Sequence, residues 1–258
     1  MRTALITGAS SGIGLELARV FARERWDLVL VSRNLSRLDA LASELSNQYG
    51  ISAQPIAQDL SDPEAPSALF EEIQRRSLRI DALVNNAGIG SFGPFMQIGL
   101  ERDIELLEIN VMSLTKLTKL FLAPMLERRE GYVLNVASTA AFQPGPLMAV
   151  YYASKAYVLS LSEALAYEVR GSGVSVSALC PGATATDFQE RAQMTRSKLF
   201  RRNVMRADVV AEAGYRGMMQ RKAVILPGLA NKLIANSSRF APRSVVVRIV
   251  RKVQEAAT

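Results

Sequence analysis

The chain of 258 residues is 49% hydrophobic and carries a formal net charge of +7 at neutral pH, and no apolar run approaches the ~20 residues of a membrane-spanning helix. Cys180 is the only cysteine, which excludes an internal disulfide and a cysteine-rich metal site. There is no histidine, so Ser-His-Asp catalysis, a histidine general base and histidine-bound zinc are excluded, and any proton transfer falls to Tyr, Lys, Asp or Glu.

The first predicted element is a strand at residues 4–6, followed at once by a glycine-rich turn. Gly8, Gly12 and Gly14 separate this strand from a helix predicted over residues 15–21. Glycine permits positive φ and close approach of backbone N–H groups to a ligand, and a helix N-terminus favours a phosphate. The spacing G-x-x-x-G-x-G differs from the commoner G-x-G-x-x-G, so a glycine turn without a ligand stays open at this point.

The rest of the chain alternates strands with helices. Further strands are predicted over residues 27–32, 52–56, 80–84, 132–136, 174–179 and 223–226, and helices over 35–49, 63–76, about 101–127, 150–169 and 207–220. This alternation favours right-handed crossovers and a parallel sheet covered on both faces. We therefore predict an α/β fold, a single doubly wound Rossmann domain with a seven-stranded parallel sheet over residues 1–228, followed by a C-terminal helical extension over 229–258.

In such sheets ligands bind at the carboxyl ends of the strands. Six polar or turn-forming residues each stand just after a predicted strand and should share that edge: Gly8, Arg33, Asp59, Asn85, Ser138 and Pro181.

Arg33 stands about 20 positions beyond the glycines, where dinucleotide-binding proteins place the residue that reads the ribose. An acidic side chain there bonds a 2′-hydroxyl, whereas a guanidinium holds a 2′-phosphate through two hydrogen bonds. No acid ends this strand, so the sequence predicts NADP(H) rather than NAD(H). A solvated surface arginine is the alternative.

Tyr151 and Lys155 are four residues apart at a helix start, so both side chains project from one face. A neighbouring ammonium stabilises a phenolate and would lower the pKa of Tyr151 from its usual value near ~10. Tyr152 has no lysine four residues later, so Tyr152→Phe should be close to neutral. A core tyrosine with an unrelated surface lysine is the alternative.

Two further residues could complete a site around Tyr151. Ser138 ends the fifth predicted strand, where its hydroxyl could bond a substrate carbonyl. Asn110 lies between Ile109 and Val111 in an apolar helical stretch, either as a proton-relay residue or, alternatively, as the site of a local helix bend or a satisfied buried amide.

With these motifs in view, the chain resembles the short-chain dehydrogenase/reductase family over residues 1–226. The matching motifs occur in order: Thr7-Gly8-x-x-x-Gly12-x-Gly14, Asp59-Leu60, Asn85-Asn86-Ala87-Gly88, the set Asn110, Ser138, Tyr151 and Lys155, and Pro181-Gly182 with Thr184 and Thr186. The resemblance resolves the unusual glycine spacing, which matches that of the family.

The resemblance implies an NADP(H) site and a catalytic tetrad. The implied cofactor-binding residues are Gly8, Ser10, Ser11, Gly12, Ile13, Gly14, Arg33, Asp59, Leu60, Asn86, Ala87, Gly88, Tyr151, Lys155, Pro181, Gly182, Thr184 and Thr186. A hydride would move between nicotinamide C4 and a carbonyl or alcohol carbon, with Tyr151 exchanging the proton. Lys155 would lower the pKa of that tyrosine and bond the nicotinamide ribose. Ser138 would hold the oxygen, and Asn110 would position a relay water.

The substrate pocket is predicted to be apolar. Three segments, residues 89–96, 140–148 and 183–200, are expected to line it, and they contain Phe92, Phe95, Phe142, Leu147, Met148 and Phe188. An apolar ketone or a long-chain oxo compound would suit such a pocket, whereas the steroid, acyl, sugar and xenobiotic classes stay open.

Residues 242–255 predict a basic amphipathic helix with Val246, Ile249, Val250 and Val253 on one side. Such a helix can lie on an anionic membrane, but we favour packing onto its own domain or a partner subunit. The basic balance allows nucleic acid, lipid or acidic protein partners, of which we expect no nucleic acid.

The sequence as a whole predicts an NADPH-dependent oxidoreductase, without a metal, that interconverts an apolar carbonyl compound and a secondary alcohol. The alternatives are a 3-oxoacyl reductase and a dinucleotide-binding regulator or interaction protein that lacks turnover. The resemblance also implies a homodimer or homotetramer that pairs the helices at about 101–127 and 150–169. The N-terminus runs straight into a strand, so we expect no signal peptide and a cytoplasmic location.

Overall fold

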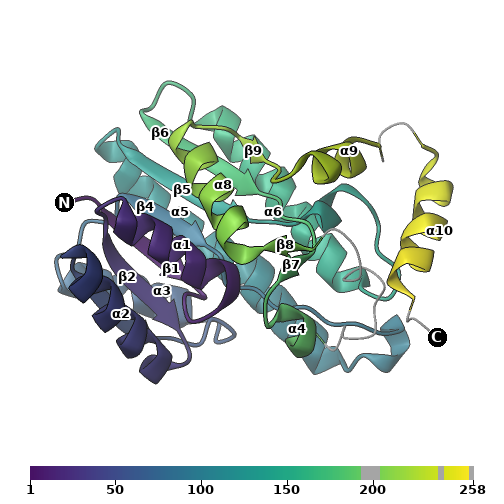
Figure 1. Cartoon of the computed structure of the whole chain (residues 1–258), viewed down its shortest axis with the longest axis horizontal. Helices are drawn as coiled ribbons and strands as arrows, with labels where there is room; N and C mark the ends of the chain where they lie inside the picture. Colours follow the sequence, from purple (N-terminus) through teal and green to yellow (C-terminus); the bar gives the residue numbers. More distant parts are fainter. Residues whose placement is uncertain (193–203, 238–240, 256–258) are drawn as a thin grey trace.

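The computed structural model describes residues 1–192, 204–237 and 241–255. Seven parallel strands form one sheet in the order β3-β2-β1-β4-β5-β6-β9, which confirms the predicted fold class (Figure 1). The strands are β1 (Thr3–Thr7), β2 (Asp27–Ser32), β3 (Ala53–Ala57), β4 (Ala82–Asn85), β5 (Gly131–Val136), β6 (Val174–Leu179) and β9 (Val224–Ile225).

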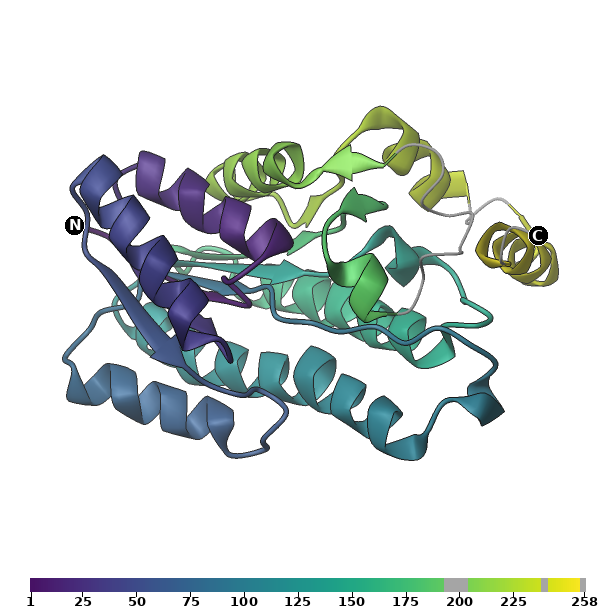
Figure 2. The ribbon, with the colours of Figure 1, turned by 60° about the horizontal axis from the view of Figure 1, so that its bottom comes forward.

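Helices cover both faces of this sheet. They are α1 (Gly12–Arg23), α2 (Leu35–Tyr49), α3 (Ala65–Arg75), α4 (Leu100–Leu107), α5 (Leu114–Glu127), α6 (Ala149–Glu168), α7 (Phe188–Arg191), α8 (Ala207–Met219), α9 (Leu229–Ser237) and α10 (Arg243–Gln254). Figure 2 shows α1 and α8 on one side of the sheet and α3, α5 and α6 on the other.

The core lies in two layers because successive side chains of a strand point to opposite faces. In β1, Ala4 and Ile6 join the apolar cluster under α1, α2 and α8. Leu5 joins the cluster under α3 and α5 on the other face. All three side chains are fully buried, which explains why the central strands read as continuous apolar runs.

The strand order reverses between β1 and β4, and this crevice positions the site. The chain moves outward from β1 to β3, then crosses back to β4 and continues to β9. Ala4, Leu5 and Ile6 pair in register with Ala82, Leu83 and Val84. The glycine turn after β1 and the asparagine motif after β4 therefore leave the sheet side by side, at the place where such folds bind ligands.

The structure departs from the predicted elements at several places. The helix expected over 101–127 contains a π-helical turn, η2 (Glu108–Ser113), between α4 and α5. The helix expected from residue 63 begins at Ala65, and the last strand is shorter than predicted. A small parallel pair, β7 (Thr184–Ala185) and β8 (Met205–Arg206), was not predicted, because two-residue strands carry no periodic signal.

The two C-terminal helices lie on the other side of the molecule from the N-terminus (Figure 1). The buried side of α10 consists of Val246, Val250 and Gln254, so this helix packs against its own domain as favoured from the sequence. Within the described ranges, no helix combines the length and the apolarity needed to cross a bilayer.

Candidate active site

The glycine turn is a tightly packed backbone loop. Gly8 and Gly12 have φ values of +66° and +57°, a conformation that strongly favours glycine. A Cβ on Gly14 would lie 2.3 Å from the Gly8 carbonyl oxygen and 2.3 Å from Asn86 Nδ2. The first turn of α1 therefore rests directly on the turn, which leaves its backbone N–H groups at a helix N-terminus, where an anion is favoured.

The asparagine motif after β4 holds this turn in place. Asn86 Nδ2 donates to the carbonyl oxygens of Thr7 (2.9 Å) and Gly8 (3.2 Å). The Thr7 hydroxyl in turn accepts hydrogen bonds from the backbone N–H groups of Asn86 and Ala87, each at 3.0 Å. These four contacts join the two loops across the crevice into one unit.

Two arginines mark one end of the crevice. Arg33 follows β2, and its guanidinium lies 3.8 Å from Asp59 and 3.9 Å from Glu105, in exposed contacts worth little to stability. Arg37, four residues further on in the first turn of α2, lines the same cavity. Two cationic side chains four residues apart suit a doubly charged phosphate, and the second of them was not predicted from the sequence.

We predict that Arg33→Asp reverses the cofactor preference toward NADH. The change removes a guanidinium that can hold the 2′-phosphate and adds a carboxylate that repels it. The measurement is kcat/KM for NADPH and for NADH in both proteins. A wild-type protein that already prefers NADH would contradict this role of Arg33.

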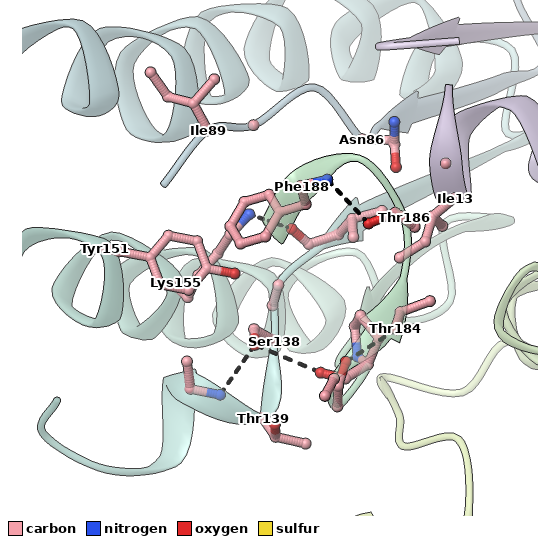
Figure 3. Close-up of a pocket in the computed structure, with 18 of the residues that line it drawn as sticks. Ile13, Asn86, Ile89, Ser138, Thr139, Tyr151, Lys155, Thr184, Thr186 and Phe188 are labelled. Carbon is pink, nitrogen blue, oxygen red and sulfur yellow. Dashed lines mark hydrogen bonds between the residues drawn. The ribbon is translucent and has the colours of Figure 1, made fainter. Parts of the chain in front are cut away.

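The other end of the crevice holds Tyr151 on α6 and Ser138 at the end of β5 (Figure 3). Ser138 Oγ accepts from the Ala140 N–H at 3.1 Å and donates to the Pro181 carbonyl at 3.5 Å. Burial raises the pKa of Tyr151 above its usual value, and a hydrogen bond with Ser138 acts in the opposite direction. This is opposite to the lowered pKa expected from the sequence, so at neutral pH the phenol is a proton donor.

Lys155 lies on the same face of α6 as Tyr151, and its ammonium hydrogen-bonds the backbone of β5. Its Nζ is 5.9 Å from the centroid of the Tyr151 ring and donates to the Val136 carbonyl at 2.8 Å. Burial lowers the pKa of Lys155 to about 8, whereas its interaction with Cys180 raises it. The four-residue spacing of Tyr151 and Lys155 was enough to predict that both lie on one face of the helix. Their pKa values depend on burial in the folded protein, which the spacing does not reveal.

The lowered pKa of Lys155 predicts how activity depends on pH. Above about 8 the ammonium loses its proton, so kcat/KM for carbonyl reduction should fall about tenfold for each further pH unit. In Lys155→Arg the guanidinium stays charged through this range, and the alkaline limb should disappear even if the rate is lower. The measurement is the pH profile of kcat/KM; the same limb in both proteins would assign it to another group.

Asn110 lies in the π-helical turn and is fully buried. Its Oδ1 accepts from the Ile89 N–H at 2.9 Å, and its Nδ2 donates to the Ile89 carbonyl at 3.0 Å and to Ser154 Oγ at 3.1 Å. Ser154 also donates to the Tyr151 carbonyl at 2.7 Å. The side chain thus ties the loop after β4 to the helix that carries Tyr151, and a π-turn at such a place is typical of functional sites.

The segment after β6 lies across the crevice, from the end of β5 to the glycine turn. Pro181 accepts hydrogen bonds from Ser138, as described, and from the Thr139 N–H at 2.8 Å. A Cβ on Gly12 would lie 3.0 Å from the methyl group of Thr186, so this segment reaches the glycine turn. Phe188, two residues beyond, places its ring 5.4 Å from that of Tyr151.

A single cavity of about 1150 Å³ connects these parts. The predicted site residues that line it are Gly8, Ser10, Ser11, Gly12, Ile13, Arg33, Asp59, Leu60, Asn86, Ala87, Gly88, Ser138, Tyr151, Lys155, Pro181, Gly182, Thr184 and Thr186. Gly14 and Asn110 do not line it and instead support the turn and the loop beside it. The cavity is larger than a single small ligand needs, so it has room for two.

The donor set of this cavity fits NADP(H). Two guanidiniums stand at one end, a helix N-terminus with glycine backbone stands in the middle, and a phenol and an ammonium stand at the other end. A Cβ on Gly88 would lie 3.2 Å from Asn110 Oδ1 and 3.3 Å from Lys155 Nζ, so a larger residue here would press on both side chains. In the part of the chain that the structure describes, no three His, Cys, Asp or Glu side chains are gathered as a metal site.

The remaining part of the cavity is mostly apolar. Ile89, Ala140, Met148 and Phe188 line it, from the segments predicted to do so. Phe95 is instead exposed, Phe142 packs into a separate cluster, and residues 193–200 lie outside the described residues. Side chains of α9 and α10 also line this part, and the sequence could not place them because no local pattern specifies a contact over so many residues.

The structure does not support the expectation that Tyr152→Phe would be close to neutral. Its side chain is buried, lines the cavity, and its hydroxyl accepts a hydrogen bond from Gln254 of α10. Tyr152→Phe would leave a buried amide without its partner, so it is not expected to be neutral. Tyr167, exposed on the same helix, is the better reference tyrosine.

Comparison with known sequences links the chain to one family. The model of the short chain dehydrogenase family matches residues 2–197. The very-long-chain 3-oxoacyl-CoA reductase of Anas platyrhynchos is 36% identical over 193 residues, which is 72% of this chain and 61% of the relative. The 17-beta-hydroxysteroid dehydrogenase type 3 of Mus musculus is 35% identical over 185 residues, 71% of this chain and 60% of the relative. The match thus spans less than two thirds of these relatives' length.

Solved structures match the chain over almost its whole length. A short-chain dehydrogenase from Sphingobium yanoikuyae in complex with NADPH is similar with a TM-score of 0.85 and 35% identity, covering 99% of both chains. The bulky-bulky ketone specific alcohol dehydrogenase from Comamonas testosteroni is similar with a TM-score of 0.80 and 31% identity, covering 99% of this chain and 97% of the other.

Proposed function

The chain belongs to the short-chain dehydrogenase family, and on that premise we propose that it is an NADPH-dependent reductase of apolar ketones. The observation that carries the proposal is one continuous cavity with two arginines at one end and the Tyr151, Ser138 and Lys155 side chains at the other. The NADPH bound to the Sphingobium protein and the bulky ketones named for the Comamonas protein support the same assignment.

When bound, the nicotinamide supplies a hydride from its C4 atom. Tyr151, kept protonated by burial, donates its hydroxyl proton to the carbonyl oxygen as that oxygen gains charge. Ser138, hydrogen-bonded to Tyr151, holds the same oxygen and lowers the cost of that charge. Lys155 would bond the nicotinamide ribose and supply positive charge beside the phenolate that remains. The raised pKa keeps Tyr151 protonated at neutral pH, the form from which it can donate a proton to the carbonyl oxygen.

The cofactor residues act along the rest of the cavity. Arg33 and Arg37 would hold the 2′-phosphate, and the glycine turn at the start of α1 would hold the pyrophosphate through backbone N–H groups. Pro181, Gly182, Thr184 and Thr186 border the nicotinamide end. Asn110 acts as a positioning residue, because its amide joins the loop at Ile89 to α6.

The experiment is NADPH oxidation by the purified protein over a panel of ketones and aldehydes of increasing apolar size. We expect turnover of the larger apolar ketones and weak activity on small hydrophilic ones. A protein that binds NADPH but reduces no member of the panel would instead be a dinucleotide-binding regulator, and the proposal would be wrong.

We also propose a homodimer or homotetramer formed through α5 and α6. Met112 and Tyr157 are large side chains exposed on the π-turn before α5 and on α6, as expected of surfaces that a second copy covers. Sedimentation at micromolar concentration should give two or four copies, and a monomer would contradict this assembly.

We further propose a domain division and a cellular location. The catalytic domain would span residues 1–228, with 229–258 as a helical extension that completes the pocket, as the α9 and α10 residues in the cavity suggest. A cytoplasmic location is supported by the single, buried cysteine, since a protein with no disulfide suits a reducing compartment.

A further inference from the structure

The C-terminal helix α10 packs against the substrate end of the cavity. Val246, Val250 and Gln254 recur every four residues and form one buried stripe. The two valines join a small apolar cluster with Met148 and Tyr152, separate from the two layers of the main core. Figure 1 shows α10 at the end of the molecule farthest from the N-terminus, apart from the helices that flank the sheet.

A second side of α10 forms part of the cavity wall. Ile249 and Val253 line the cavity although they stay 54% and 42% exposed. Val245 is exposed to a similar degree, 40%, but does not line the cavity. Of the exposed apolar residues of α10, Ile249 and Val253 could therefore touch a bound substrate, whereas Val245 could not.

One hydrogen bond ties α10 to the residue next to Tyr151. Gln254 Nε2 donates to the Tyr152 hydroxyl at 2.5 Å, across 102 positions of sequence. Gln254 is fully buried, and its Oε1 has no partner among residues 1–192, 204–237 and 241–255. The rings of Tyr152 and Tyr151 are 6.1 Å apart, so the bond fixes α10 within reach of the reacting group.

We propose that α10 is the wall that determines substrate specificity and that Gln254, through Tyr152, is the positioning residue that keeps this wall against the site. The substrate class is an apolar ketone whose bulk extends from the carbonyl beside Tyr151 to Ile249 and Val253. This inference rests on the proposed ketone reductase activity and names the substrate that the same site accepts.

Two ketones that share the reacting ring and differ by one phenyl group test the wall: cyclohexanone and 4-phenylcyclohexanone. Ile249→Ala should lower kcat/KM for the phenyl compound about fivefold, because apolar contact area is lost. The same change should alter kcat/KM for cyclohexanone much less, since that ketone lacks the group that would contact α10. Val245→Ala is the matched control on the same helix. An equal loss of kcat/KM for the phenyl compound in both variants would contradict the role of α10 as a wall of the substrate site.

The positioning role is tested by Gln254→Met, which keeps the length of the side chain and deletes the hydrogen bond. We expect KM for 4-phenylcyclohexanone to rise about fivefold, the effect of one lost hydrogen bond, with a smaller change in kcat. Combining Gln254→Met with Tyr152→Phe should add nothing further, because both changes remove the same bond. Additive losses would show that Gln254 acts without Tyr152 and would overturn this role.

Proteolysis tests the attachment of α10 without any turnover. Trypsin can cut after Arg248, Arg251 and Lys252 only when α10 opens, so mass spectrometry of these fragments reports its opening. Gln254→Met should be cut about fivefold faster than the wild-type protein, and 4-phenylcyclohexanone with NADP⁺, which has no hydride to transfer to the ketone, should slow the cutting in both. Equal rates without ligand, or no protection by the ketone, would overturn the proposal. Faster cutting in a protein that reduces no ketone would instead overturn the proposed function alone.

Discussion

Tyr151→Phe should reduce kcat for ketone reduction by about 10⁴ or more while leaving the fold and NADPH binding in place. Loss of general acid catalysis is worth about 10²–10⁴ in rate, and the phenol also hydrogen-bonds Ser138 beside the reacting oxygen. The ring and its contact with Phe188 remain, so packing changes little. The measurements are kcat with an apolar ketone, the dissociation constant of NADPH from fluorescence, and the melting temperature.

Tyr167→Phe is the matched control for this change. Tyr167 lies on the same helix, is 67% exposed, and has the Arg170 guanidinium over its ring. Its loss of one hydroxyl should leave kcat within about twofold, as is usual for a surface substitution. A loss of less than tenfold in Tyr151→Phe, or similar losses in both variants, would rule out Tyr151 as the proton donor.

Gly14→Ala should weaken NADPH binding by about 100-fold. The added Cβ would lie 2.3 Å from the Gly8 carbonyl oxygen, which is backbone and can move only with the turn itself. Displacing the turn costs the charge-assisted hydrogen bonds that its N–H groups would make to a phosphate, about 3 kcal/mol for two. Overpacking should also lower the stability of the protein by about 1–3 kcal/mol. Fluorescence titration with NADPH and thermal unfolding measure the two effects.

Gly99→Ala is the matched control, because it makes the same substitution at a glycine outside the turn. A Cβ on Gly99 meets no heavy atom within 4 Å, and its backbone φ of −63° suits alanine. This variant should bind NADPH and unfold as the wild-type protein does. Normal NADPH affinity in Gly14→Ala would mean that the turn does not hold the pyrophosphate.

The fold was predictable because each signal for it lies within a short stretch of sequence. The apolar run at Ala4–Ile6, the glycines after it and the alternation of later elements all follow from local backbone preference and burial. The boundaries of α3 and β9 differ by one or two residues, and the π-turn at Asn110 was anticipated only as the alternative of a local helix bend. That turn is stabilised by the backbone of Ile89, 21 positions away, which no periodicity within a helix reveals.

Only those parts of the site that belong to local sequence motifs could be predicted. Spacing placed Tyr151 and Lys155 on one face of a helix, but the direction of the tyrosine pKa depends on burial and differs from the expectation. Arg37 had a signal, since it stands four residues after Arg33 in the first turn of the predicted helix, and it could have been found. The contact between Gln254 and Tyr152 had none, because it depends on where the chain brings α10 in space.

The central claim is that this cavity transfers a hydride from NADPH to an apolar ketone with Tyr151 as the proton donor. The most direct measurement is a reaction of the wild-type protein with NADPH deuterated at nicotinamide C4, followed by mass spectrometry of the products. We predict that the deuterium of one C4 face appears on the carbinol carbon of the alcohol, and that Tyr151→Phe forms almost no labelled alcohol although it binds the cofactor. NADPH binding by the wild-type protein with no labelled alcohol from any apolar ketone would contradict the claim.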